Sequence, residues 1–282
     1  MKQMLRTAVL LVPLVLAGCS STFAYNNLDW LLYWYLDDYV DLQRDQKQVF
    51  DQQLDTWLQW HRAEELGAYR NHLNDLREDL SQPHISAETL LAHMNRGRGH
   101  WERFRDRIVP GLAEFSPRLS DEQVNQLFDE LEEQNRKNEQ ERYEGTEQER
   151  QAQRVEDLQD QVKGYIGRLT DSQKVLIAEH APLFESSFDG WIQYRRQIQA
   201  KARALFDARH DNPAFVAELK ALMLDPDQEK SDEYVAISNR NRARFAQLAS
   251  QLHDTLTDKQ RKRLLGEIDD LIDDLTTLIE DD

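Results

Sequence analysis

The chain has 282 residues, with 35 Lys and Arg against 52 Asp and Glu, which gives a net charge of −17. This length is sufficient for one large domain or two small ones with a buried core. The negative charge argues against general nucleic-acid binding, because a polyanion would be repelled. The single Cys excludes intrachain disulfides and Cys-based zinc clusters. With 10 Gly and 7 Pro, the chain is also poor in the turn residues that a β-sandwich requires.

Residues 1–18 have the pattern of a bacterial lipoprotein signal peptide. Two basic residues are followed by an apolar run at residues 8–17, which is too short to span a bilayer at about 20 residues. The run ends in Leu-Ala-Gly-Cys at residues 16–19, which resembles a lipobox. We therefore predict lipidation of Cys19. A plain secretory signal with an incidental Cys and a buried structural Cys are the alternatives.

The predicted lipid sets the expected location of the protein. Ser20 follows Cys19, and by the sorting rule of bacterial lipoproteins a residue other than Asp implies the outer membrane. Residues 19–282 are then expected to form a single periplasmic domain held by the lipid, since three acyl chains make release negligible. Removal of residues 1–18 takes two basic charges and leaves a net charge of −19.

Apolar residues recur at helical spacing along almost the whole chain, and runs of period two are absent. The pattern predicts an all-α fold, an elongated bundle of about six to eight helices with long amphipathic helices. Pro residues are expected to end helices at 83 and 110 and to kink one at 182. The predicted helices are an aromatic one over 25–42, then 42–83, 86–110, 120–168, 170–206, a short one from 213, and two that begin near 227 and at 257.

One short phrase, Leu-Ser/Thr-Asp-x-Gln, occurs three times, at residues 119–123, 169–173 and 256–260. Its Ser or Thr can cap the exposed helix amides, and its Gln can reach back to the cap, so the phrase predicts three capping boxes. It resembles the L-T-x-x-Q motif of the Spy and CpxP periplasmic proteins, which are helical chaperones or sensors. The acidity of this chain departs from the basic concave face of that family.

A broader resemblance begins at the predicted lipid site. Cys19 is followed by Ala-Tyr-Asn-Asn-Leu-Asp-Trp-Leu-Leu-Tyr-Trp at 24–34 and by Asp-Asp-Tyr-Val-Asp-Leu at 37–42. These residues resemble a family of proteobacterial lipoproteins defined only as a domain of unknown function, and the likeness runs along the whole mature chain. The resemblance implies a helical lipoprotein and assigns no activity or site residues.

The predicted aromatic helix over 25–42 has two interpretations. A helix so apolar must be buried or lie at an interface. It could be a first core helix whose aromatic side chains fill the bundle, which the carboxylates at 37, 38 and 41 favour. It could instead be an anchor at the level of the lipid headgroups, where Trp and Tyr are enriched.

Basic side chains are concentrated in residues 96–108, which we call the Arg cluster. Guanidinium groups offer planar pairs of donors to carboxylates and phosphates, so the cluster is a candidate site for an anionic envelope polymer or an acidic protein. The alternative is pairing with acidic helices of the same chain, and we predict a contact with the acidic end at 267–282. The candidate residues are Arg96, Arg98, His100, Arg103, Arg105 and Arg107.

Two further helices have unusual charge patterns. The middle of the helix predicted over 120–168 has almost no apolar residue, so we expect it to protrude as a polar arm or to fray at Gly145. The C-terminal helix carries basic residues at its start and acids at its end, which opposes the helix dipole. Tertiary contacts must therefore outweigh the unfavourable charge order.

The sequence contains no catalytic motif that favours a particular reaction. His61 and Glu65 are four residues apart, but no second pair at metal spacing accompanies them. We therefore expect no metal, no cofactor and no enzymatic activity. The chain is expected to act as an interaction, scaffold or chaperone-like module of the cell envelope. A hydrolase acting on peptidoglycan is the alternative.

Overall fold

A computed structural model describes residues 24–280, and these residues form helices joined by turns and irregular segments, with no strand among them. The all-α prediction is confirmed. The predicted signal peptide and Cys19 lie outside the described residues. The α-helices are α2 (Leu28–Leu36), α3 (Arg44–Trp60), α4 (Leu66–Ser81), α5 (Ala87–Phe115), α6 (Asp121–Tyr143), α7 (Glu147–Ile166), α8 (Asp171–His180), α9 (Phe188–Asp207), α10 (Phe215–Leu224), α11 (Asp232–Asp254) and α12 (Asp258–Glu280).

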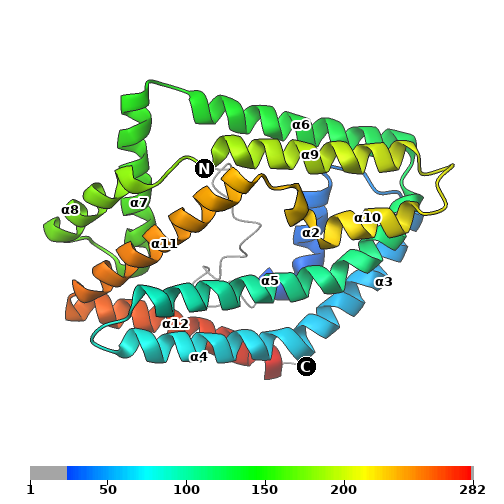
Figure 1. Ribbon diagram of the computed structural model, residues 1–282. Helices are drawn as coiled ribbons and strands as arrows, with labels where there is room; N and C mark the ends of the chain where they lie inside the picture. Colours follow the sequence, from blue (N-terminus) through cyan, green and yellow to red (C-terminus); the bar gives the residue numbers. More distant parts are fainter. Residues whose placement is uncertain (1–23, 281–282) are drawn as a thin grey trace.

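The described residues form eleven α-helices, where the sequence predicted six to eight. The expected elongated bundle is not confirmed. In Figure 1, α4, α5 and α12 lie along one side, and α6 lies beside α9 on the opposite side. Buried apolar side chains form five separate clusters among the described residues. The helices thus pack in small local groups.

The first long helix pattern corresponds to α3 and α4, which are joined by a π-helical turn at His61–Glu65. Helix α5 begins at the predicted cap Ser86 but continues through Pro110 to Phe115, so the predicted end at Pro110 is wrong. Burial explains the continuation, because Val109 and Ala113 are 3% and 0% exposed and outweigh the lost hydrogen bond.

The helix predicted over 120–168 is two helices, and the prediction of one long helix is wrong. Gly145 separates α6 from α7 with a φ of 76°, a left-handed conformation that favours Gly. The expected protruding arm is also wrong for α6. Its polar face packs against α9, where Arg196 pairs with Glu132 and Glu139, both at 2.8 Å.

Further boundaries differ from the sequence prediction. The short helix expected from 213 begins at Phe215, and the helix expected near 227 begins at Asp232, after a 3₁₀ turn over Pro226–Glu229. The expected kink at Pro182 is a full break, because a 3₁₀ turn and an extended segment separate α8 from α9. The aromatic helix predicted over 25–42 is shorter, since α2 ends at Leu36. Val40 and Leu42, on the segment that follows α2, are buried in the cluster beneath α3.

Helices α10, α11 and α12 return to the first half of the chain. Both α10 and α11 pack on α5, and α12 lies along α4 (Figure 1). Leu275 and Leu278 of α12 are buried with Leu66 of α4. None of the helices within 24–280 has the length and apolar character needed to cross a membrane.

Candidate functional site

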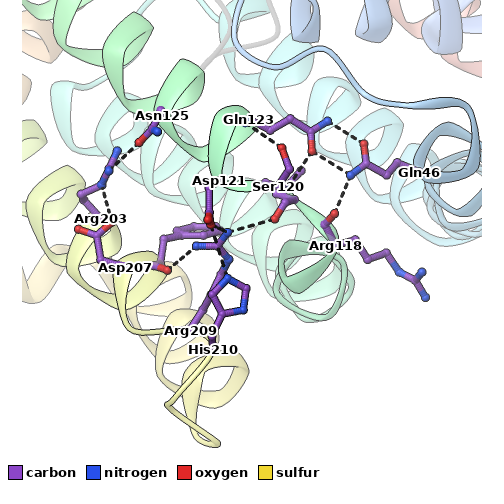
Figure 2. Close-up of polar contacts among 12 residues, drawn as sticks. Gln46, Arg118, Ser120, Asp121, Gln123, Asn125, Arg203, Asp207, Arg209 and His210 are labelled. Carbon is purple, nitrogen blue, oxygen red and sulfur yellow. Dashed lines mark hydrogen bonds and ion pairs between the residues drawn. The ribbon is translucent and has the colours of Figure 1, made fainter.

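The capping phrases have a second role that the sequence did not predict. Gln123 of α6 and Gln46 of α3 exchange amide hydrogen bonds of 2.7 and 2.9 Å between their side chains (Figure 2). Each Nε2 also donates to a backbone carbonyl at 2.6 Å, Gln46 to Arg118 and Gln123 to Asp41. Each Gln side chain therefore helps to cap its own helix and also joins that helix to the start of a distant one.

The other two phrases form the same arrangement. Gln173 of α8 and Gln260 of α12 exchange hydrogen bonds of 3.0 and 2.8 Å. Gln260 also donates to the carbonyl of Arg168, and Gln173 to that of Thr255. Gln46 has no Ser or Thr cap before it, which is why its equivalence to the three phrases was not visible in the sequence. All four Gln side chains are buried, so we assign these phrases to the framework.

Three histidines connect α4 to α5 in a continuous chain that we call the histidine seam. His72 lies on α4, and His93 and His100 lie seven residues apart on α5. The Nε2 atom of His72 lies 3.1 Å from Nδ1 of His93, and its Nδ1 lies 3.1 Å from Nε2 of His100. The chain ends at Asp79, whose carboxylate is 2.8 Å from Nε2 of His93.

The partners of the seam determine where its protons lie. A guanidinium can only donate, so Nδ1 of His100 accepts from Arg103 and its Nε2 carries the proton. That Nε2 donates to Nδ1 of His72, whose own Nε2 then donates to His93. His93 donates in turn to the carboxylate of Asp79. Every ring nitrogen is satisfied when all three imidazoles are neutral, and an added proton would set two donors against each other.

The π-helical turn positions one end of the seam. Glu65, the last residue of the turn, is 4% exposed and accepts two hydrogen bonds from Arg103 of α5, at 2.8 and 3.1 Å. The pair is bidentate, so it fixes the orientation of the guanidinium as well as its position. Turns of this kind are frequent at functional sites, because they insert one residue into a helix and redirect its side chains.

The surroundings of His72 and His100 disfavour their charged forms. Burial, with a further contribution from Arg96, lowers the pKa of His72 to about 4. Burial and then Arg103 also lower the pKa of His100. These directions agree with the hydrogen-bond pattern, which accommodates neutral rings.

A second series of ring contacts leads from Tyr25, near the start of the described residues, to His100 of the seam. The Tyr25 hydroxyl lies 3.0 Å from Nδ1 of His61, and Nε2 of His61 lies 3.3 Å from the Tyr69 hydroxyl. The Tyr69 ring then meets the His100 ring edge to face, with centroids 4.7 Å apart. Burial lowers the pKa of His61 to about 4. His61 and Glu65, which lie four residues apart in the sequence, therefore belong to two different networks.

The Arg cluster does not form one surface. Its members point to three neighbours around α5: toward α4, toward the segment around α10, and toward the end of α3. The interpretation that the cluster pairs within the chain fits this arrangement. The partners are Asp75 for Arg96, Glu102 and Asp227 for Arg98, His72 for His100, Glu65 for Arg103, Asp106 for Arg105, and the ring of Trp60 for Arg107.

The predicted contact between the cluster and the acidic C-terminal helix is wrong for the residues that the structure describes. Helix α12 lies along α4, and its carboxylate Asp269 pairs with Arg77 instead. Arg77 precedes the cluster and was not identified, because a single Arg among acidic neighbours gives no signal in the sequence.

An open hollow of about 570 Å³ lies between α5 and the end of α10. It contains both basic and acidic groups, and Arg98 already bridges two of the acids. Its lining is mixed in charge, so it does not favour a simple anion. The lining residues are Arg98, Glu102, Arg105, Asp106, Pro110, Lys220, Leu224, Asp225 and Asp227.

The geometry of the seam is that of a line. The two nitrogens of His72 face different partners on opposite sides of the ring, so the three imidazoles do not converge on one point. Within residues 24–280, no group of three or more His, Cys, Asp or Glu side chains is arranged to hold a metal ion. The arrangement can relay protons, and with neutral rings it joins α4 to α5.

The fold and the seam define an all-helical protein with buried apolar clusters and a histidine-linked contact between two of its helices. The chain belongs to a family of unknown function, DUF6279, whose model matches residues 38–235. The predicted resemblance to an uncharacterised family is thereby confirmed. Searches of the curated proteins and of the solved structures found no match.

Proposed function

We propose that the protein is a lipoprotein of the bacterial outer membrane whose helical body faces the periplasm and acts as a non-enzymatic interaction, scaffold or chaperone-like module. The observation that carries the proposal is the position of the single Cys. Cys19 follows a basic start and an apolar run of signal-peptide length, where lipidation requires it. Ser20 directs such a lipoprotein to the outer membrane.

The contacts of the body favour interaction through apolar side chains. The guanidinium groups of the Arg cluster already contact acidic side chains or a ring of the same chain, so an external anion would have to displace them. Several large apolar residues remain exposed and are available to partners. They are Trp30, Trp34, Trp101, Tyr143, Tyr165, Val175, Leu183 and Val235.

The anchor is tested by replacing the thiol. In cells fed a palmitate analogue, the full chain should incorporate the label and Cys19→Ala should incorporate none. Ser20→Asp is the matched control, since it keeps the thiol and should keep the label while moving the protein to the inner membrane. Labelling of Cys19→Ala at the wild-type level would contradict the proposal.

The role of the body is tested with the purified full chain. A chaperone-like role predicts that it suppresses aggregation of an unrelated unfolded protein, and a scaffold role predicts a specific crosslinked partner in envelopes. Turnover of purified peptidoglycan by the same preparation would contradict the non-enzymatic proposal and favour a hydrolase.

A further inference from the structure

Helix α2 exposes two tryptophans to solvent. Trp30 and Trp34 are 64% and 59% exposed, more than any other large apolar side chain that the structure leaves exposed within residues 24–280. Indole rings are rarely left in water without a reason, because each carries a large apolar area. Two such rings on one short helix therefore indicate a surface that is covered in the working protein.

The two rings lie on the same side of the helix. Residues four apart are separated by about 40° around an α-helix, so Trp30 and Trp34 form one stripe. The opposite side packs on the cluster beneath α3 through Leu32 and Leu36. Asp29 is turned by about 100° from Trp30, whereas Asp37, just after the helix, lies on the side of the two rings and is 4.0 Å from Lys47. The stripe is thus a pair of exposed indoles that ends at an acidic residue, on a helix whose other face is fixed to the body.

The start of the described chain is held close to the predicted lipid site. Ala24, the first described residue, is five residues after Cys19, and an extended chain of that length spans at most about 18 Å. Tyr25 hydrogen-bonds His61, and Asn26 accepts from Arg62 at 3.0 Å. The body is therefore attached directly after the lipid site, and α2 is the first helix to meet whatever surface holds the lipid.

The chemistry of α2 fits the headgroup layer of a bilayer. Trp is favoured there, because its ring has an apolar body and one polar N–H group. The sequence of α2, Leu-Asp-Trp-Leu-Leu-Tyr-Trp-Tyr-Leu, contains no Lys or Arg. Attraction to anionic lipid is therefore absent, and the contact would depend on apolar area.

We propose that Trp30 and Trp34 insert into the headgroup layer of the membrane that holds the lipid on Cys19, so that α2 lies on the membrane surface and orients the body. This inference rests on the proposed lipidation. The phospholipid surface would then cover the exposed stripe, and the helical body would keep one orientation relative to the membrane.

The experiment uses the full lipidated chain in vesicles of phosphatidylethanolamine and phosphatidylglycerol with bromine on their acyl chains. Bromine quenches indoles that reach the bilayer. The protein has six Trp residues, so seating of two of them should remove about a third of the emission. The double variant Trp30→Phe/Trp34→Phe should lose nearly all of this quenching.

Trp101→Phe is the matched control, because Trp101 is also exposed but lies on α5. It should keep the quenching of the wild-type protein. Equal quenching of the wild-type and the double variant would overturn the inference, as would absence of quenching in the wild type, which would leave the stripe to a protein partner. Incorporation of the lipid label is measured in the same samples, so failure of lipidation is distinguished from failure of the contact.

Discussion

The histidine seam depends on the protonation of single side chains. Its hydrogen bonds run in one direction from Arg103 to Asp79, and each imidazole in between donates once and accepts once. A second proton on His72 would face the N–H of His100 and break that order. The contact between α4 and α5 therefore requires neutral rings.

This requirement makes stability depend on pH. The pKa of His72 is lowered to about 4 in the folded protein, against about 6.5 in the unfolded chain. The unfolded chain binds the proton first as the pH falls, so the free energy of unfolding should decrease between about pH 6.5 and pH 4. Denaturant unfolding at a series of pH values should show this loss, and His72→Asn should make the loss smaller in that window. His61 and His100, whose pKa values burial also lowers, should contribute the remainder.

His84→Asn is the control for this prediction. His84 is exposed beside Asp254 and lies outside the seam. Its replacement should leave the loss of stability between pH 6.5 and pH 4 close to that of the wild-type protein. A wild-type protein with constant stability across the window, or a His72 variant with the same loss as the wild type, would contradict the role of the seam.

The sequence identified only part of this site. His100 and Arg103 stood out because basic residues are dense in residues 96–108. His72 and His93 gave no signal, since a lone His on a helix is common and their meeting depends on how α4 packs against α5. For Glu65 the sequence shows only its spacing from His61. Its contact with Arg103 depends on a π-helical turn, which has no sequence pattern.

Among the elements, helix starts were predicted best. Ser86, Ser120 and Thr170 cap helices as expected, because a cap is a local contact between residues three apart. Helix ends were predicted less well. Pro110 lies inside α5, because burial of its neighbours outweighs a local penalty of about 3 kcal/mol. A short stretch of sequence does not reveal tertiary contacts of this kind.

The paired Gln side chains should matter more than the caps they complete. Thr170→Ala removes one cap and should lower the free energy of unfolding by about 1 kcal/mol. Gln173→Ala also removes the hydrogen bond to the Thr255 carbonyl and leaves one side of the buried Gln260 unpaired, and should cost about 2–3 kcal/mol. Urea unfolding of both variants measures the difference.

A double-mutant cycle tests the coupling between the two Gln residues. Because Gln173→Ala and Gln260→Ala break the same pair of hydrogen bonds, the double variant should lose less stability than the two single losses added together. Additive losses, or equal losses for Gln173→Ala and Thr170→Ala, would show that the phrase acts as a cap alone.

The whole molecule is joined by contacts between its two halves. The Gln46 and Gln123 pair lies in the first half, the Gln173 and Gln260 pair in the second, and α12 then returns to lie along α4. The sequence showed that α12 needs strong tertiary contacts, because its charges oppose the helix dipole. The sequence does not identify the helix that packs against α12, since any acidic helix can pair with any Arg. The structure assigns the contact to α4, through Arg77 and a buried apolar face.

Removal of the end of α12 should therefore destabilise the whole protein. A chain that ends after Leu265 loses Ile268, Leu275 and Leu278, each buried against the first half. At about 1.5–3 kcal/mol for each buried side chain, the loss approaches the total stability of an ordinary domain, about 5–15 kcal/mol. Thermal unfolding followed by circular dichroism should show a much lower Tm or no cooperative transition.

Asp269→Asn removes only the exposed pair with Arg77 and should cost less than about 1 kcal/mol. Because the acidic partners of the Arg cluster all precede residue 265, the truncated chain, where it folds, should bind anionic vesicles no better than the full chain. A truncated chain that keeps its Tm would show that α12 is not needed for packing. One that folds and binds such vesicles more tightly would show that α12 shields the cluster.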